Sequence, residues 1–372
     1  MRVLVVARSR DCRDNHLWRE AQRRGVNVVV VSPSFQECLC PRHIGAGLEQ
    51  VGYASTWSLG TDTSRWIRNF KRTVSATDPD LIHVDSEPWS LQVRSALQTG
   101  LPVVPHSAEN VISNAPWWLK LRRSNMRRNL NEIAGLACWG ITSKMAIGEL
   151  FDLSTIPHAV VPACPPSPEE FPFRVEPRCS ELLQIGYVGR TVPYKGLPLL
   201  ISAIRGADLA RRVQLQVLSL QTIPADLLEF CRREGIQVTT SKATSAIEVA
   251  DFMSRCDVVA IPSGRTRRWS EQWGRVAAEA QLVGTPVLLA DSGELPHMAT
   301  SLAKVLPNND VECWAKALAS FVPDRAPWHG PTDRRIETNV ARRKEITARF
   351  SLEKYADEIV DLWGNVLKGV GL

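Results

Sequence analysis

Two glutamates with a glycine between them are the residues of this sequence best suited to act on a bound ligand. Glu271 and Glu279 stand eight positions apart, and Gly274 lies between them. The pattern predicts that Glu271 precedes a helix and that Glu279 lies within it. Carboxylates near one ligand can act as acid and base, or they can accept hydrogen bonds from hydroxyl groups.

The segments around these glutamates predict a βαβ unit. The apolar run 258–261, after Asp257, reads as a buried strand that ends in the turn Pro262-Ser263, and Gly284-Thr285-Pro286 leads into a second buried strand at 287–290. Open α/β sheets bind ligands at the carboxyl ends of their strands. We therefore expect Glu271 at the mouth of a site.

Two cations follow an earlier strand of the same type. Arg190 and Lys195 stand five positions apart in the turn after the strand 183–188, and a helix is predicted to begin near Gly196. The positive end of that helix points toward the same turn. Arginine can hold a diphosphate with its planar fork, and lysine can hold it as a point charge. Taken alone, the two residues fit a solvated basic turn equally well.

Size and composition indicate a two-domain globular protein. The chain has 372 residues, of which 44% are hydrophobic and 23% are charged. The net charge is +6, and residues 1–165 hold 19 Lys and Arg against 14 Asp and Glu. This excess suits an anionic ligand or surface, but it is too small to indicate nucleic acid.

The cysteines and the apolar segments favour a cytoplasmic protein. The nine cysteines are odd in number and lack paired spacing, which is typical of a reduced chain. Residues 1–7 are predicted to form a first strand rather than a signal peptide, and no apolar run approaches the roughly 20 residues that span a bilayer. For Cys38, Cys40 and His43, a plain loop is favoured over a metal site.

Alternating strand and helix patterns in both halves predict an α/β fold with doubly wound parallel sheets. The proline-rich stretch within 162–180 is the predicted linker. We expect domains at 1–165 and 166–350, followed by a terminal helix within 351–372 that Ser351 caps. The predicted strands are 3–7, 26–31, 81–84, 103–105, 135–139, 159–161, 183–188, 215–218, 238–240, 258–261, 287–290 and 304–306, and the predicted helices of the first half are 15–24, 62–75, 88–98, 115–132 and 142–150.

Taken in order, the motifs of the second half resemble retaining GT-B glycosyltransferases of the family-4 type, the glycosyl transferases group 1. The resemblance covers about residues 183–320 strongly and the first half weakly. It implies a GT-B fold, in which two Rossmann-like doubly wound domains face a central cleft and a C-terminal helix crosses back to the first domain. The motifs are Gly189-Arg190, Lys195-Gly196, Pro262-Ser263, Glu271 to Glu279, Gly284-Thr285-Pro286-Val287 and Asp291 to Pro296.

The resemblance also assigns the donor site. Arg190 and Lys195 match the pair that holds the diphosphate, Glu279 matches the acid that binds ribose, and Glu271 matches the acid beside the donor sugar. The helix start formed by Gly274, Arg275 and Val276 matches the backbone that meets sugar and phosphate. Preorganised cations and a helix N-terminus stabilise the charge of a leaving diphosphate. No metal and no cofactor beyond the nucleotide sugar are implied.

The acceptor side is less well defined. His106 matches a histidine that several family members place near the acceptor, and the alternative is a buried structural histidine. Asp85 and Glu87, after the strand 81–84, could contact the acceptor or form a turn, and Glu109 and Asn110 are further polar candidates.

Three segments depart from the pattern or leave alternatives open. The loop Arg8 to Asp14 lacks the glycine pair usual in this family, so its role is open, and Cys164-Pro165-Pro166 replaces a Gly-Val-Asp motif. The basic and aromatic stretch 117–128 could touch a membrane, but an ordinary helix is favoured.

The sequence therefore predicts a retaining, metal-independent hexosyltransferase. It would move a sugar from a UDP- or GDP-type nucleotide sugar to a small-molecule, glycan or lipid-linked acceptor. The alternatives are a related enzyme that uses water or a non-hydroxyl acceptor, and a non-catalytic nucleotide-sugar binder.

Overall fold

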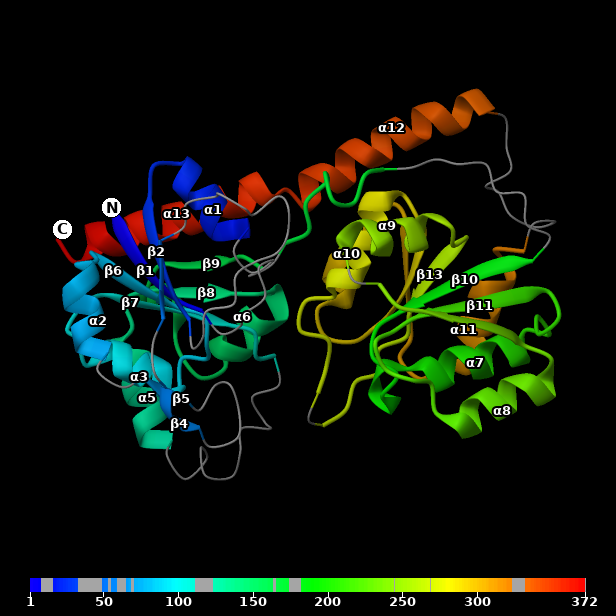
Figure 1. The fold of residues 1–372 in the computed structure, drawn as a ribbon, viewed down its shortest axis with the longest axis horizontal. Coiled ribbons are helices and arrows are strands. Elements are labelled where there is room, and N and C mark those ends of the chain that lie inside the picture. Colours follow the sequence, from blue (N-terminus) through cyan, green and yellow to red (C-terminus); the bar gives the residue numbers. More distant parts are fainter. Residues whose placement is uncertain are drawn as a thin grey trace. The chain divides into compact units, whose positions relative to one another are not determined.

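The structure is a computed structural model. It describes residues 1–7, 16–32, 49–52, 55–58, 65–67, 70–110, 123–162, 165–173, 182–243, 245–267, 269–322 and 332–371. The chain forms two compact units (Figure 1). The first unit comprises Met1–Pro165 together with Leu352–Leu372, and the second comprises Pro166–Ser351.

The first unit is built on a parallel sheet with the strand order β3-β2-β1-β6-β7-β8-β9. A separate antiparallel pair is formed by β4 and β5. The strands are β1 Arg2–Val6, β2 Asn27–Ser32, β3 Glu49–Gly52, β4 Ser55–Ser58, β5 Arg65–Ile67, β6 Leu81–Val84, β7 Val103–Ser107, β8 Leu136–Cys138 and β9 His158–Val160, and the helices are α1 His16–Arg23, α2 Phe70–Thr77, α3 Leu91–Leu97, α5 Arg123–Glu132, α6 Ile141–Gly148 and α13 Leu352–Gly369.

Successive residues of each central strand face opposite layers of this unit. Val3 and Val5 of β1 pack in a core with α1 and α13, whereas Leu4 and Val6 pack in a second core with α2, α3, α5 and α6. This is the period of two that a pleated strand imposes, and burial of both faces explains why the strands are continuously apolar.

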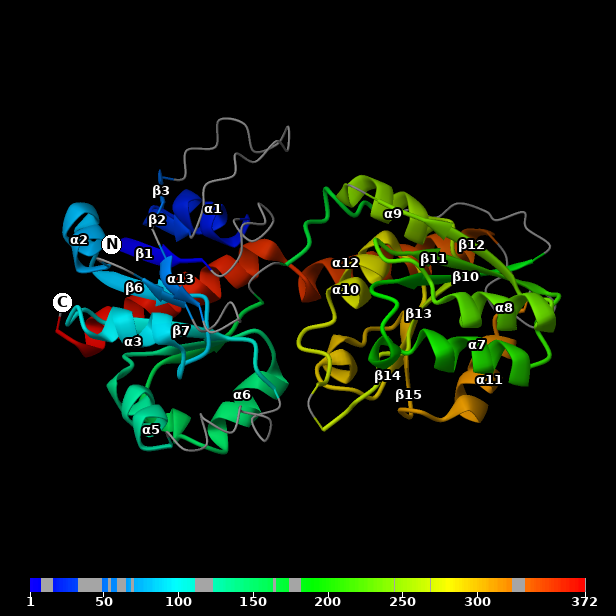
Figure 2. The same ribbon diagram turned by 60° about the horizontal axis from the view of Figure 1, so that its bottom comes forward.

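The second unit repeats this design with the strand order β12-β11-β10-β13-β14-β15. Helices α7, α8 and α11 cover one face of the sheet, and α9, α10 and α12 cover the other (Figures 1 and 2). Its strands are β10 Leu183–Val188, β11 Val213–Leu218, β12 Gln237–Ser241, β13 Val258–Ile261, β14 Val287–Ala290 and β15 Ala303–Leu306, and its helices are α7 Leu197–Gly206, α8 Ala225–Glu234, α9 Ala246–Ser254, α10 Arg275–Val283, α11 Val311–Ala319 and α12 Thr332–Arg349.

All the predicted strands are confirmed within one or two residues at their ends. The helix predicted at 62–75 is wrong in its first part, because β5 occupies Arg65–Ile67 and helix α2 begins only at Phe70. The short strands β3, β4 and β5 were not predicted. None of the described helices is long and apolar enough to cross a membrane.

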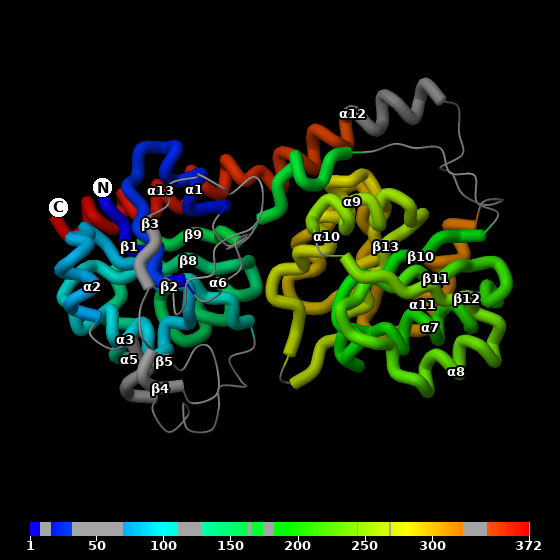
Figure 3. The backbone as a smooth tube through the Cα atoms, viewed as in Figure 1, coloured from blue at the N-terminus to red at the C-terminus, as the bar shows by residue number. Residues whose placement is uncertain are grey.

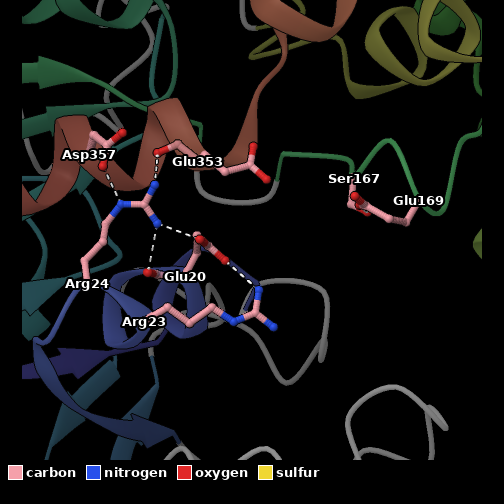
Figure 4. A network of polar contacts seen from close by, with 7 residues as sticks. All are labelled: Glu20, Arg23, Arg24, Ser167, Glu169, Glu353 and Asp357. Carbon is pink, nitrogen blue, oxygen red and sulfur yellow. Dashed lines mark hydrogen bonds and ion pairs between the residues drawn. The ribbon is translucent and has the colours of Figure 1, made fainter.

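The C-terminal helix α13 packs beside α1 in the first unit (Figure 3). Arg24, just after α1, holds the two helices together at their edge, as Figure 4 shows. Its guanidinium bonds to the carboxylate of Asp357, to Glu20 Oε1 at 2.6 Å and to the Glu353 carbonyl oxygen at 2.8 Å. In the second unit, the hydroxyl of Ser167 donates a hydrogen bond to Glu169 (Figure 4).

Beneath this edge, two buried histidines form a directed chain of hydrogen bonds. Trp363 Nε1 of α13 donates to His83 Nδ1 at 3.2 Å, so the proton of a neutral His83 is on Nε2. That nitrogen lies 3.2 Å from His106 Nδ1, and His106 Nε2 lies 2.6 Å from the Val161 carbonyl oxygen. The ring of Trp18 packs against His83 with centroids 4.9 Å apart. The bond from Trp363 requires a neutral His83, and the bond between the two histidines requires a neutral His106.

Acid should therefore destabilise the first unit through His83. Burial, with a smaller effect of His106, lowers the pKa of His83 well below its usual value of about 6.5. The unfolded chain then binds more protons than the folded one below pH 6.5. The free energy of unfolding should fall by about 1.4 kcal/mol for each pH unit below 6.5, until the folded pKa is reached.

NMR of ¹⁵N-histidine-labelled protein measures this protonation directly. At pH 6 the His83 ring should still show the neutral Nε2–H form. An ordinary titration with a midpoint near 6.5 would contradict the hydrogen-bond chain.

Candidate active site

A pocket of about 190 Å³ lies at the carboxyl ends of β10 and β13 in the second unit. The order of strands along the chain reverses between these two neighbours, and such a switch point is where open α/β sheets bind ligands. Five of the residues that the sequence predicted for the donor site line this pocket. The described lining is Tyr187, Val188, Lys195, Ala260, Ile261, Pro262, Ser263, Glu271, Gly274, Arg275 and Val276.

The pocket brings together Lys195 and Glu271, which are far apart in the sequence. Lys195 Nζ lies 2.7 Å from Glu271 Oε2, and the two side chains are only 19% and 14% exposed. A half-enclosed pair of this kind is screened less than a surface ion pair. The pocket therefore presents one positive and one negative group to the same ligand.

The N-terminus of α10 forms another part of the pocket wall. Gly274 precedes this helix with φ +77, a left-handed conformation, and no side chain caps the helix start. A Cβ at Gly274 would come within 2.6 Å of Leu295 Cδ2, so a larger residue would be both strained and crowded. An uncapped helix start directs backbone N–H groups and the positive end of the helix dipole toward a ligand.

Glu279 lies one turn further along α10 and is tied to the pocket through Arg275. Arg275 Nε donates to Glu279 Oε1 at 2.7 Å, and the Glu279 side chain is 7% exposed. Glu279 is not among the described lining residues, whereas Arg275 is. The prediction that Glu279 binds ribose is neither strengthened nor weakened by this position.

Arg190 lies beside the pocket rather than in its described lining. Its backbone is fixed because Tyr187 Oη donates to the Arg190 carbonyl oxygen at 2.6 Å. The guanidinium is exposed and lies 5.6 Å from the centre of the Tyr194 ring.

Burial raises the pKa of Tyr187 far above its usual value, and Glu271 adds to that rise while Arg190 opposes it. Tyr187 thus stays a neutral hydrogen-bond donor.

His106, predicted on the acceptor side, lies in the core of the first unit. It has no exposed surface, and the contacts described above engage both ring nitrogens. This is the arrangement of the structural histidine that the sequence left as the alternative. We therefore give His106 no part in the function proposed below.

The remaining acceptor-side candidates follow β6 and β7. Glu87 is buried, accepts a hydrogen bond from the Ser107 hydroxyl, and accepts another from the Ala108 N–H at 3.2 Å. Asp85 is also buried, while Glu109 and Asn110 are half-buried. Glu87 thus stabilises the end of β7 through these two hydrogen bonds. Contact of these four residues with an acceptor stays a prediction.

Several predicted features lie wholly or partly outside the described residues. They are the loop Arg8 to Asp14, the Cys38, Cys40 and His43 group, parts of the linker 162–180 with Cys164, and the basic stretch 117–128, of which the structure describes the helical backbone from Arg123 and the side chain of Arg128. Within the described part of the chain, no group of three or more His, Cys, Asp or Glu residues is placed to hold a metal ion.

Sequence reasoning missed several residues of the site. The spacing of Arg275 and Glu279, four apart on a predicted helix, could have revealed their ion pair. Tyr187 at the end of β10 carries no motif that singles it out, and Ser263 was predicted only as part of the Pro262-Ser263 motif after β13. The contact between the Tyr194 and Trp269 rings joins positions too distant in the sequence for any local pattern to indicate.

Comparison with solved structures defines the class of fold. The Anabaena protein HepE in complex with UDP superposes with a TM-score of 0.72 over 98% of this chain and 100% of that chain, at 17% identity. Sucrose-phosphate synthase of Thermosynechococcus elongatus superposes with a TM-score of 0.71 over 99% of this chain and 100% of that chain, at 16% identity. The fold is GT-B.

The sequence of the second unit is similar to a known family. Residues 170–343 match the model of the family described as glycosyl transferases group 1. Among curated relatives, D-inositol 3-phosphate glycosyltransferase of Stackebrandtia nassauensis is 29% identical over 205 residues, which are 50% of this chain and 43% of that protein. The enzyme of the same name from Rhodococcus erythropolis is 33% identical over 173 residues, which are 45% and 34% of the two chains. The matched segment thus spans less than half the length of these relatives.

Proposed function

We propose that this protein is a retaining glycosyltransferase that moves a sugar from a nucleotide diphosphate sugar to a hydroxyl acceptor. The observation that carries the proposal is the Lys195–Glu271 pair, 2.7 Å apart, in a pocket at the N-terminus of α10. Transfer of a sugar creates negative charge on the leaving diphosphate and positive charge on the sugar ring, and this pocket offers a group of opposite sign to each.

Each donor-site residue then has one role. Lys195, Arg190 and the start of α10 hold the diphosphate as its bond to the anomeric carbon breaks and the electron pair passes to the leaving oxygen. Glu271 orients the sugar ring and stabilises its developing positive charge. Glu279 accepts hydrogen bonds from the ribose hydroxyls, with Arg275 fixing its carboxylate.

The comparisons support a nucleotide sugar as the donor. HepE has been crystallised with UDP and with UDP-glucose, and the curated relatives are named for transfer to D-inositol 3-phosphate. For this chain the proposed donor is a UDP- or GDP-type sugar, and the proposed acceptor is a small molecule, a glycan or a lipid-linked molecule. Metal independence, absence of nucleic-acid binding and a cytoplasmic location remain predictions.

The function is tested by incubating the protein with a panel of UDP- and GDP-sugars and measuring released nucleoside diphosphate, with and without acceptors and with EDTA. We expect release from at least one donor, stimulated by an acceptor and unaffected by EDTA. Lys195→Ala should weaken binding of the matching nucleoside diphosphate by roughly 10-fold or more, since it removes a charge-assisted contact.

Lys316→Ala is the matched control. Lys316 forms an exposed pair with Glu312 on α11, 2.6 Å apart, so its loss should leave binding unchanged. Tight donor binding without any release would favour a non-catalytic binder, and release that no acceptor stimulates would favour a hydrolase.

A further inference from the structure

Two aromatic side chains connect the two cations of the donor site. The rings of Tyr194 and Trp269 lie with their centres 4.6 Å apart at an interplanar angle of 44°. Arg190 Cζ lies 5.6 Å from the centre of the Tyr194 ring, and Lys195 Nζ lies 4.7 Å from the centre of the Trp269 ring. The four side chains form a continuous series in which a cation stands at each end of an aromatic pair.

Each contact in the series is attractive for a known physical reason. A cation within about 6 Å of a ring centre is drawn to the negative face of the ring, and tryptophan gives the strongest effect. Tilted aromatic pairs at this separation stabilise one another beyond their buried area. The lysine ammonium thus has two attractive contacts, one with the Trp269 ring and one with the Glu271 carboxylate.

We propose that Tyr194 and Trp269 form a positioning unit that holds Arg190 and Lys195 in place for the diphosphate of the donor. This inference rests on the proposed function, because it assumes that the two cations bind a diphosphate. Neither aromatic residue is a catalytic residue in it. Both act through the cations.

The backbone around the aromatic pair fixes its geometry. The Gly264 N–H donates to the Tyr194 carbonyl oxygen at 2.8 Å, and the Thr266 N–H donates to the Trp269 carbonyl oxygen at 2.8 Å. Gly196, directly after Lys195, has φ +78, and a Cβ there would lie 1.9 Å from the Pro262 carbonyl oxygen. The turn after β10 and the loop after β13 are therefore fitted closely to each other.

The advantage of such a unit is lower entropy loss on binding. Arginine and lysine have long side chains that lose much rotamer freedom when they are ordered. An aromatic surface that orders them beforehand shifts this cost from ligand binding to folding, which tightens binding without a new ligand contact. The size of one cation–π contact corresponds to roughly 2- to 20-fold in a binding constant.

The test compares Trp269→Leu with Trp269→Phe by calorimetric titration with UDP and GDP up to millimolar concentration. Trp269→Leu should weaken binding of the preferred nucleotide about fivefold, and Trp269→Phe should retain most of the affinity because it keeps a ring. Leu220→Ala, at a position 77% exposed in the same unit, is the control and should bind as the wild type does. The melting temperatures show whether the variants fold.

A double-mutant cycle with Lys195→Ala separates a positioning role from a merely structural one. Trp269→Leu should weaken binding less in the Lys195→Ala background than in the wild type, because the ring then has no ammonium to hold. Equal effects in both backgrounds, or an unchanged affinity in Trp269→Leu, would overturn the inference. If the wild type binds neither nucleotide, the proposed function fails instead and the positioning unit falls with it.

Discussion

Replacing Glu271 with glutamine should reduce sugar transfer by roughly 100- to 1000-fold while leaving the binding of nucleoside diphosphate intact. Glutamine keeps the size of the side chain and its capacity for hydrogen bonding but removes the negative charge that, in the proposed mechanism, faces the sugar. That charge matters most when the sugar ring becomes positive, so its loss should raise the barrier to transfer more than it weakens binding.

The Lys195–Glu271 pair makes the binding part of this prediction specific. With Lys195 Nζ 2.7 Å from Glu271 Oε2, the carboxylate competes with a diphosphate for the same ammonium. Glu271→Gln should therefore bind UDP or GDP as tightly as the wild type or more tightly. A variant that lost binding and turnover together would show that Glu271 holds the nucleotide rather than the sugar.

Steady-state turnover and nucleotide titration of the same preparation measure the two effects. Glu312→Gln is the matched control, because Glu312 is an exposed carboxylate paired with Lys316 on α11. It should leave both measurements unchanged. Wild-type turnover in Glu271→Gln would remove Glu271 from the reaction.

Most of the second unit could be predicted from the sequence because its strands are buried on both faces. Burial makes each strand a short, continuous apolar run, and the polar residues that follow each run mark the carboxyl edge of the sheet. Lys195 and Glu271 meet because β10 and β13 are neighbours, with Gly186 opposite Val259 in the parallel register. In this class of fold, ligands bind where the strand order reverses, which here is between β10 and β13. The contact between Lys195 and Glu271 could therefore be expected once the fold was known.

No motif predicted that His106 is buried in the core, but the alternation of side chains along β7 indicated which face of the sheet it occupies. Two residues before it, Val104 faces the core with α1 and α13, so alternation sets His106 on that same face. The sequence did not reveal the hydrogen-bond partners. Trp363 enters this core from the far end of the chain and donates to His83, whose other ring nitrogen contacts His106.

The contact between the Tyr194 and Trp269 rings could not be predicted from the sequence for a related reason. Tyr194 stands in the short 3-10 helix Pro193–Lys195 and Trp269 stands in the loop after β13, and neither segment has a periodicity that would predict which side chains face each other. The first part of the helix predicted at 62–75 was wrong because its apolar spacing also suits a short strand followed by a later helix. Local patterns therefore predicted the elements well and the contacts between loops poorly.

Replacing Gly293 with alanine should both destabilise the second unit and reduce transfer by 100-fold or more. Gly293 has φ +56, and a Cβ there would lie 2.1 Å from the Glu271 carbonyl oxygen and 2.8 Å from the Glu271 nitrogen. These are backbone atoms, which cannot rotate away as a side chain could. The Glu294 N–H also donates to that carbonyl oxygen at 2.9 Å, so the two loops have little room to separate.

The added methyl group should push the Glu271 backbone away from Lys195 and the pocket. The left-handed conformation costs alanine about 1–2 kcal/mol, and crowding adds about 1–3 kcal/mol. A shift of about 1 Å in a reacting group can cost roughly 100-fold in rate. Thermal unfolding and turnover per folded molecule measure the two effects separately.

Gly364→Ala is the control for this substitution. Gly364 lies in helix α13, and a Cβ there meets nothing within 4 Å. Alanine should therefore be tolerated at Gly364 and should raise stability by about 0.4–1 kcal/mol. If Gly293→Ala lost stability but kept wild-type turnover in its folded fraction, Glu271 would not need Gly293 to hold its position. If Gly293→Ala instead lost turnover but kept the stability of the wild type, the methyl group would disturb only the Glu271 loop. The close fit of the two loops would then be needed for the reaction and not for folding.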